Sequence, residues 1–265
     1  MNIRQVMTNQ SIGFVGGGRI TRILLEGLGR YGSLPDRVVV SDTNQEALER
    51  LKERWPLIEA APGNNALAGA QRFVVLAVPE SAIAEVAAQV RPALRPESVV
   101  ISLAPKITIA KLAAALGGFA RIARMMPNAP AMVNTGFNPV AFSPVLTDAD
   151  KRATAELGVA WGCCPQVVEE KLEAFAILTS MGPAYFWFQM YELRRLALAF
   201  GLTNAEAQLG LERLFIGLCR TMAEPGLSQE EVQGLVGAQP LKDLEPSLVE
   251  AYRTRLEAVM RQIKP

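Results

Sequence analysis

The sequence contains no histidine among its 265 residues. This absence excludes serine–histidine and cysteine–histidine catalysis, histidine ligation of a metal, and histidine as a general acid. The three cysteines, Cys163, Cys164 and Cys219, lack the spacing of metal ligands, so we expect no metal site and no structural disulfide. Any chemistry must therefore come from a cofactor, backbone groups, hydroxyls, carboxylates or amines.

An excess of charge of one sign is also absent, because 27 basic and 26 acidic residues leave a net charge of +1. This balance provides no electrostatic reason to expect nucleic acid or an anionic membrane as a partner. No apolar run approaches the length of a membrane span, and the opening residues MNIRQVMTNQS lack the apolar core of a signal peptide. We therefore expect a cytoplasmic protein.

Short β-branched runs alternate with helical patterns from Ser11 to about Pro144, which is typical of a parallel sheet wound with helices. Runs such as FVVLAV and SVVISLA suit strands that are covered on both faces. The predicted strands are Ser11–Val15, Val38–Ser41, Phe73–Ala77, Ser98–Leu103 and Arg121–Met125.

Helix ends in this sequence have recognisable signals. Gly117 and Gly118 follow an apolar helix predicted over 108–116, where a left-handed cap is expected. Four pairs have the spacing of a capping box: Thr43 with Glu46, Thr147 with Asp150, Thr203 with Glu206, and Ser228 with Glu231.

Long helices replace the strands after about Glu169. One is predicted from Pro183 to just before Gly201, and its first turns are apolar nearly all round, which favours a subunit interface. A last amphipathic helix is predicted over 247–263. We divide the chain into a nucleotide-binding domain, residues 1–165, and a helical domain, residues 166–265.

The segment SIGFVGGGRIT has the spacing of a dinucleotide-binding turn, with Gly16, Gly18 and Thr21 at its three key positions. The first glycine allows the tight turn, and the second lets backbone approach a pyrophosphate. Thr21 is larger than the residue usually found at the third position. Since the segment joins an apolar strand to a helix, it predicts a phosphate site at the helix N-terminus.

Asp42 ends the second predicted strand, where an acid accepts hydrogen bonds from the adenosine ribose and favours NAD. A 2′-phosphate would be repelled by this acid and would need an arginine nearby. Asp42 also has a simpler interpretation as a residue at a helix entry. The cofactor is therefore expected to be NADP or NAD.

The chain resembles the pyrroline-5-carboxylate reductase family along nearly its whole length. IGFVGGGRIT is similar to that family's IGFIGGGNMA, and VVLAVPES stands where the family has LAVKP. RMMPNAPAMVNTG is similar to RxMPNTPAxVxxG, and AILTSMGPAYFWF to ALSGSGPAYVF. MPNAPA and GPAY are specific, because no simple packing rule requires those strings.

The resemblance implies an α/β fold, with an N-terminal Rossmann-type doubly wound parallel sheet followed by an all-helical dimerisation domain. It implies a homodimer through the C-terminal helices, with an active site shared across subunits. The positions that match the family's nucleotide contacts are Gly16, Gly18, Arg19, Ile20, Ser41, Asp42, Thr43, Asn64, Ala77, Val78, Pro79 and Asn128. Asn64 could instead cap a helix, and Asn128 could brace its own proline-rich loop.

Departures from the family pattern concern the substrate side. SLAPK replaces SAAG and puts Lys106 where glycine is usual, while Met181 replaces a serine. The SPGGTT loop, whose residues in the family hold the substrate, has no counterpart in GLVGAQPLKD. Tyr191 stands where a glutamate is expected.

Reduction of a C=N bond in a small cyclic imine, pyrroline-5-carboxylate or a related substrate, is the activity that the resemblance implies. Thr179 and Ser180 are candidate catalytic hydroxyls, although they could simply cap the following helix. Backbone amides where that helix begins could bind an anionic group. The predicted substrate residues are Met181, Gly182, Pro183 and Ala184.

Two alternatives stay open. A non-catalytic relative could bind the dinucleotide as a sensor or structural ligand, which the missing threonines favour. A different Rossmann dehydrogenase, such as a deazaflavin-linked NADP reductase or a β-hydroxyacid enzyme, is the other alternative. The latter would need a catalytic lysine, but Lys171 lies in EEKLEAFAIL, without that family's flanking glycines and asparagine.

Overall fold

The computed structural model describes residues 10–32, 34–224 and 226–265. Contacts within the chain divide it into two compact units. Unit 1 consists of Met1–Met181 and Val259–Pro265, and unit 2 of Gly182–Ala258. The division into domains at residues 165 and 166 stays a prediction.

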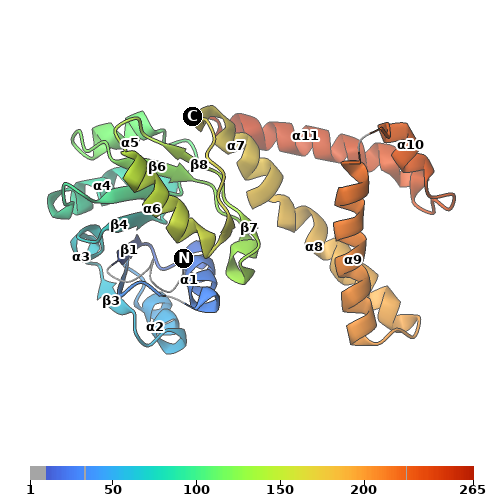
Figure 1. Ribbon diagram of the computed structural model, residues 1–265, viewed down its shortest axis with the longest axis horizontal. Coiled ribbons are helices and arrows are strands. Elements are labelled where there is room, and N and C mark those ends of the chain that lie inside the picture. Colours follow the sequence, from blue (N-terminus) through green and yellow to red (C-terminus); the bar gives the residue numbers. More distant parts are fainter. Residues whose placement is uncertain (1–9, 33, 225) are drawn as a thin grey trace. The chain divides into compact units, whose positions relative to one another are not determined.

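Unit 1 is built on a seven-stranded sheet with the order β3-β2-β1-β4-β5-β6-β8 (Figure 1). All neighbouring strands are parallel except β6 and β8. The sheet therefore has the doubly wound order of a Rossmann fold, as predicted. Its strands are β1 (Ser11–Val15), β2 (Arg37–Asp42), β3 (Glu59–Pro62), β4 (Phe73–Leu76), β5 (Val99–Ser102), β6 (Ile122–Met125) and β8 (Val140–Phe142).

β3 is a strand that the sequence pattern did not predict. Its residues EAAP include no β-branched side chain and end in proline, which disfavours a strand. It forms because its backbone pairs in parallel with β2 at the edge of the sheet. The two-residue strands β7 (Gly136–Phe137) and β9 (Gly162–Cys163) pair with each other in the same way.

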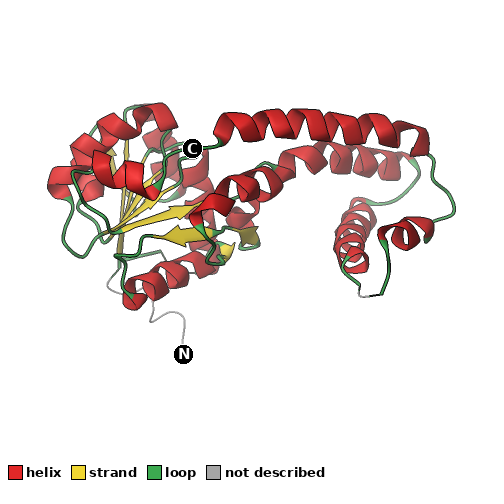
Figure 2. Ribbon diagram, turned by 90° about the horizontal axis from the view of Figure 1, so that it is seen from above, coloured by secondary structure: helices red, strands yellow, loops and turns green. Residues whose placement is uncertain are grey.

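Helices cover both faces of the sheet (Figure 2). Alternate strand residues, such as Phe14 and Val75, pack on one face against α1 (Arg19–Tyr31), α2 (Gln45–Arg54) and α6 (Asp148–Val159). Their neighbours, such as Val15 and Val74, pack on the other face. The helices there are α3 (Asn65–Gly69), α4 (Ile83–Val90) and α5 (Ile109–Ala115).

Most of the predicted helix ends are confirmed. The capping boxes that begin at Thr147, Thr203 and Ser228 have both of their hydrogen bonds, and Gly117 and Gly118 have positive φ. The box predicted at Thr43 is wrong: Asn44 is the N-cap, and its Oδ1 accepts from Ala47 N at 3.1 Å. β2 extends to Asp42, so the helix begins one residue later than the spacing indicated, and asparagine caps it equally well.

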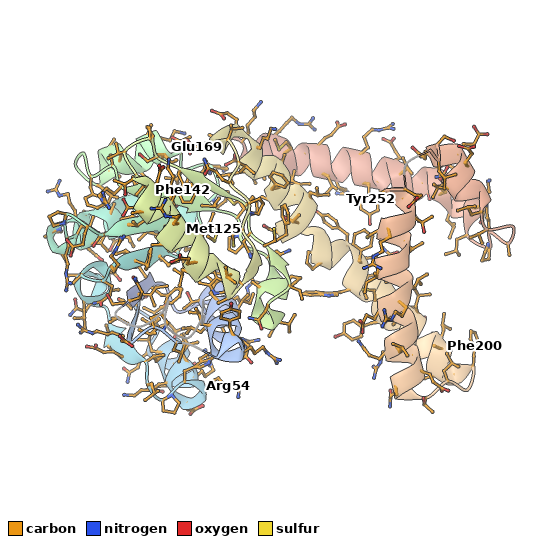
Figure 3. All side chains as sticks on the ribbon, in the orientation of Figure 1. Arg54, Met125, Phe142, Glu169, Phe200 and Tyr252 are labelled. Carbon is orange, nitrogen blue, oxygen red and sulfur yellow. The ribbon has the colours of Figure 1, made fainter. Side chains whose placement is uncertain are left out.

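Unit 2 contains α8 (Gly182–Ala199), α9 (Asn204–Met222), α10 (Gln229–Gly234) and most of α11 (Glu245–Ile263). These helices bury few side chains. Gly182 is the buried residue of α8, Ala207 that of α9, and α11 has none. Large apolar side chains are exposed instead, among them Phe200 at 80% (Figure 3). Within the described ranges, no helix has the length and apolar character to span a membrane.

Candidate functional site

The turn between β1 and α1 requires glycine at its first position. Gly16 has φ = 103°, and a Cβ added there would lie 2.5 Å from the backbone oxygen of Ala77. Gly18, in contrast, would place its Cβ in open space, with no atom within 4 Å. Gly18 is the N-cap of α1, and no side chain caps that helix. The first amides of α1 therefore face a space that a phosphate group can approach.

Thr21 is accommodated at the third position because its hydroxyl is used within the turn. The side chain has no exposed surface, and Oγ1 donates to Gly16 O at 2.5 Å. A threonine here therefore stabilises the glycine turn, although it is larger than the residue usually found at this position.

Asp42, at the end of β2, holds the glycine turn through its carboxylate. Oδ2 accepts from Gly17 N at 2.6 Å, and Oδ1 accepts from Asn44 N at 2.7 Å. Ser41 is fully buried and donates its hydroxyl to Asn65 Oδ1, whereas Thr43 is exposed. The structure therefore brings the predicted segment 41–43 next to the glycine turn.

Other predicted nucleotide residues lie at the same edge of the sheet. Ala77 follows β4, and its N donates to Val15 O at 2.8 Å. Val78 and Pro79 continue from it. Asn64 precedes α3 and caps it, since Oδ1 accepts from Leu67 N at 3.1 Å. Its contact with a nucleotide stays a prediction.

Asn128 braces the loop that follows β6. Its Oδ1 accepts from Phe137 N at 3.0 Å, and its Nδ2 donates to Thr179 O at 3.2 Å. The side chain thus joins the MPNAPA loop to the helical segment that carries the candidate hydroxyls. Among the residues that the structure describes, one amide proton and one acceptor position of the Asn128 side chain have no partner, and a ligand can use them.

The two candidate hydroxyls differ in their surroundings. Thr179 Oγ1 donates to Phe175 O within its own helix at 2.8 Å. Ser180 Oγ lies 3.4 Å from Met126 O. Both residues belong to a π-helical turn, Ala176–Ser180, that follows α7 (Leu172–Phe175) and precedes α8. They do not cap a free helix start, because Met181 N already donates to Ala176 O.

A pocket of about 250 Å³ lies at the carboxyl edge of the sheet, entirely within unit 1. Its lining comes from the segments that follow β1, β4, β5 and β6, from the π-helical turn, and from the end of α11. These residues are Ile20, Ala77, Val78, Leu103, Pro105, Met126, Pro127, Ala176, Ser180, Met181 and Ile263. Ligands of open α/β sheets bind at this edge.

Sequence reasoning found four of the cofactor and substrate residues that line this pocket, Ile20, Ala77, Val78 and Met181, together with the candidate Ser180. It missed Met126 and Pro127, although they belong to the recognised MPNAPA motif. It also missed Ile263, for which the sequence contains no signal. The other predicted substrate residues, Gly182, Pro183 and Ala184, form the first turn of α8.

Lys106 has a left-handed backbone conformation, which glycine adopts more readily than lysine. Its φ is 63°, a left-handed conformation that costs a lysine about 1 kcal/mol. Its Nζ lies 3.2 Å from Glu80 Oε2, in the segment after β4. Lys106 therefore stands beside the pocket residue Pro105 with an acidic partner.

The cysteines and acids form no metal site in the part of the chain that the structure describes. Cys163, Cys164 and Cys219 are free thiols. Burial raises the pKa of Cys164 to about 11, although a hydrogen bond from Asn138 acts against it. A raised pKa keeps the thiol of Cys164 protonated near neutral pH and therefore weakly nucleophilic.

Comparisons with known proteins find similar sequences over most of the chain. Residues 11–106 match the family described as NADP oxidoreductase coenzyme F420-dependent. A pyrroline-5-carboxylate reductase of Methanosarcina acetivorans is 26% identical over 231 residues, which cover 87% of this chain and 85% of that protein. The enzyme of Pseudomonas aeruginosa is 28% identical over 208 residues, covering 78% and 72%.

Two solved structures extend the likeness to three dimensions. A pyrroline-5-carboxylate reductase from Coxiella burnetii has a TM-score of 0.72 and 28% identity, and covers 96% of this chain and 97% of that one. The Plasmodium falciparum pyrroline carboxylate reductase with NADP bound has a TM-score of 0.79, with 97% and 98% coverage. At 19% identity, the second likeness concerns the fold.

The glycine turn, the strand order and these relatives define the class: the chain is an NAD(P)-dependent oxidoreductase with a Rossmann nucleotide-binding fold. Within this class it is a relative of the pyrroline-5-carboxylate reductases. The resemblance inferred from MPNAPA and GPAY is therefore confirmed.

Proposed function

We propose that the protein reduces the C=N bond of a small cyclic imine, pyrroline-5-carboxylate or a related compound, with NAD(P)H. The observation that carries the proposal is the small pocket at the carboxyl edge of the sheet, directly after the glycine turn. When bound, the dinucleotide supplies the hydride. The pocket is the place where this chain can hold a planar imine against it.

The residues of the glycine turn fit a dinucleotide. Gly16 permits the turn, Gly18 leaves room for the pyrophosphate, and the uncapped amides of α1 can donate to it. The segment 41–43 and the residues Ala77–Pro79 are proposed to contact the remainder of the cofactor. Asn128 is proposed to hold the nicotinamide ribose with its free amide proton.

Ser180 is the polar side chain in an otherwise apolar pocket lining. Apolar walls exclude water and strengthen any hydrogen bond that forms inside. An imine can arrive already protonated at nitrogen, so the absence of histidine is no obstacle. We propose that Ser180 Oγ, which lies 3.4 Å from Met126 O, orients the substrate. Thr179 directs its hydroxyl to Phe175 O and is assigned no contact with the substrate.

An anionic group on the substrate needs donors that the missing threonine loop no longer provides. In the first turn of α8, Gly182 and Ala184 have amides, whereas Pro183 has none. A role of Gly182, Pro183 and Ala184 in binding that group stays a prediction, because the π-helical turn leads directly into α8 and Met181 N already donates to Ala176 O.

A homodimer through the C-terminal helices is part of the proposal. Phe186, Trp187, Phe188 and Tyr191 of α8 are between 46% and 69% exposed in the single chain. Such a concentration of aromatic surface favours contact with a second copy. The proposed location is the cytoplasm, where the three free cysteines stay reduced.

The extent of the resemblance favours imine reduction over deazaflavin-linked chemistry. The match to the F420-dependent family covers residues 11–106, which is the nucleotide-binding part. The likeness to pyrroline-5-carboxylate reductases continues over 87% of the chain and includes the segment that carries Ser180 and Met181.

Oxidation of NADPH and NADH, followed by absorbance with pyrroline-5-carboxylate and a panel of cyclic imines, tests the proposal. We expect turnover on at least one imine. If the folded protein binds the dinucleotide but turns over none of them, the reductase proposal is wrong and a non-catalytic nucleotide-binding role replaces it.

A further inference from the structure

The pocket at the carboxyl edge of the sheet has no charged side chain among the lining residues that the structure describes. Those side chains are apolar except for the hydroxyl of Ser180. A carboxylate among them would lose its hydration without meeting an opposite charge, which is unfavourable. A substrate with an anionic group therefore needs a cation at the border of the pocket.

Lys106 and Glu80 form an ion pair at this border. The segment after β4 lines the pocket at residues 77 and 78 and reaches Glu80 two residues later. The segment after β5 lines the pocket at residues 103 and 105, and Lys106 comes next. Lys106 Nζ lies 3.2 Å from Glu80 Oε2. The pair therefore joins the two segments where they leave the pocket.

The sheet already holds these two segments side by side, so the ion pair is not needed for that purpose. β4 and β5 are parallel neighbours, and Leu103 N donates to Leu76 O at 3.1 Å just beyond them. The side chains of Lys106 and Glu80 are 36% and 41% exposed. An ion pair this exposed contributes little to stability, and the flexible lysine side chain can exchange one partner for another.

The backbone of Lys106 also sets this residue apart. In the described part of the chain, the residues other than glycine with positive φ are Lys106 and Asn134. Asn134 has a structural use, because its Nδ2 donates to the backbone oxygens of Gly27 and Ala160. Lys106 instead directs its ammonium group to an exposed carboxylate. An unfavourable backbone conformation of this kind is typical of positions that contact a ligand.

The guanidinium of Arg124 is not available in place of Lys106. Arg124 is the cation of β6, the strand that leads to the pocket residues Met126 and Pro127. It has no exposed surface and donates to Glu169 at 2.8 Å and to Glu173 at 2.6 Å. Two carboxylates thus already neutralise its charge.

We propose that Lys106 is a substrate-binding residue, whose ammonium group exchanges Glu80 for the anionic group of the substrate at the border of the pocket. The inference rests on the proposed imine reduction for the identity of the substrate, but the contact can be measured without turnover. A hydrogen bond from an ammonium group to a carboxylate is stronger than one between neutral groups. Glu80 competes with the substrate for the lysine, so removing Glu80 and removing Lys106 should have opposite effects.

Titration of the full chain with cyclopentanecarboxylate and with cyclopentanecarboxamide, followed by NMR at saturating NADP⁺, tests the contact. The two compounds have the same five-membered ring and nearly the same size, but only the first is charged, and neither has a C=N bond to reduce. We expect the carboxylate to bind at least about fivefold more tightly, because its hydrogen bond to the lysine is charge-assisted. The preference should decline as salt increases.

Substitutions of the two partners distinguish a ligand contact from a structural ion pair. Lys106→Gln should reduce the preference to about twofold or less and leave the amide affinity unchanged. Glu80→Gln should strengthen carboxylate binding about twofold or more, because the competing carboxylate is gone. Lys111→Gln is the matched control, since Lys111 is an exposed cation on α5 outside the pocket lining, and should keep the preference. Lys106→Arg should retain part of it.

Steady-state kinetics provides a second measurement on the proposed reaction. Lys106→Gln should raise KM for pyrroline-5-carboxylate about fivefold or more with little change in kcat. KM for 1-pyrroline, which has the same ring without a carboxylate, should stay unchanged. A variant that is only less stable would change both substrates alike.

Equal binding of the two cyclopentane compounds by the wild type, or binding of neither, would overturn the inference. Equal losses of carboxylate affinity in Lys106→Gln and Glu80→Gln would also overturn it, because they would assign the pair a structural role. A carboxylate preference that depends on Lys106, without turnover on any imine, would support the contact and contradict imine reduction. The two proposals therefore fail in different measurements.

Discussion

Arg124 has no exposed surface, and its Nη2 donates to Glu173 Oε1 at 2.6 Å. Its Nη1 donates to Glu169 Oε1 at 2.8 Å. Arg124 belongs to β6, which leads into the Asn128 loop, and Glu173 belongs to α7, which leads into the turn that carries Ser180. This buried ion pair thus joins the two segments that line the pocket after β6.

Removal of one partner from this pair should destabilise the fold strongly. Glu173→Gln should lower the free energy of unfolding by about 3 kcal/mol, because it leaves a buried guanidinium with one carboxylate partner fewer. Glu59→Gln is the control: Glu59 pairs with Arg37 at 2.8 Å, but both side chains are more than 40% exposed. Its effect should stay under about 1 kcal/mol. Urea unfolding measures both, and equal losses would show that the buried pair has no special role.

Asp150 should make the stability dependent on acid pH. Burial acts to raise its pKa, but hydrogen bonds from Thr147 and Arg72 and the charge of Arg121 outweigh burial, so the pKa lies below its ordinary value of 3.8. The folded pKa is therefore the lower one. The stabilisation is complete above about pH 5, well above the ordinary pKa, and is lost as the pH falls through the folded pKa.

Asp150→Asn should be less stable than the wild type at pH 7 by about 2 kcal/mol. It should also lose less stability than the wild type between about pH 5 and pH 2. Asp148→Asn, on the exposed side of the same helix turn, should keep the wild-type slope. Thermal unfolding over this pH range measures the slopes. If the stability of Asp150→Asn falls with pH as steeply as that of the wild type, the acid sensitivity belongs to another group.

The two glycines of the nucleotide turn should respond differently to alanine. Gly18→Ala has open space for its Cβ and an ordinary φ of −75°, so folding should be unaffected. Its methyl group should instead hinder the pyrophosphate and weaken dinucleotide binding about tenfold or more. Gly16→Ala should lower the stability by about 2 kcal/mol, because φ is 103° and the methyl would meet Ala77 O. Unfolding curves and nucleotide titrations distinguish the two effects, and normal dinucleotide affinity in Gly18→Ala would argue against the phosphate site.

Ser180 and Thr179 are neighbouring hydroxyl residues, and their variants can show which hydroxyl contacts the substrate. Ser180→Ala should reduce kcat/KM for the imine about tenfold or more without changing dinucleotide affinity, since one hydrogen bond to the substrate is lost. Thr179→Val should change kcat/KM less than about threefold, because its hydroxyl is bonded within the helix. Steady-state kinetics with each variant provides the comparison. A larger loss in the threonine variant would reverse the two roles.

The proposed dimer can be tested on its exposed aromatic surface. Phe188→Asp places a charge on a side chain of α8 that is 68% exposed, and should convert a dimer into monomers. Leu57→Asp changes a side chain that is 87% exposed in unit 1, and should leave the dimer intact. Light scattering after size-exclusion chromatography measures the mass. A monomeric wild-type protein would contradict the dimer directly.

Much of the fold could be predicted because its signals are local. Five strands of the sheet were predicted to within one or two residues, since near-continuous apolar runs are typical of parallel strands buried on both faces. β3 was not predicted, because EAAP becomes a strand through its pairing with β2. The capping box predicted at Thr43 was wrong because two possible N-cap residues, Thr43 and Asn44, are adjacent in the sequence. The position at which β2 ends determines which of them caps α2.

For the candidate site, the linear sequence was sufficient to place the glycine turn, the segment after β2 and the MPNAPA loop, because each is a short motif whose geometry depends on its own residues. It could not reveal that Asp42 accepts a hydrogen bond from Gly17 N, that Arg22 and Arg50 line one groove between α1 and α2, or that Ile263 lines the same pocket as Ile20. Those relationships join residues far apart in the chain, and they exist because strand order and helix packing set which side chains meet.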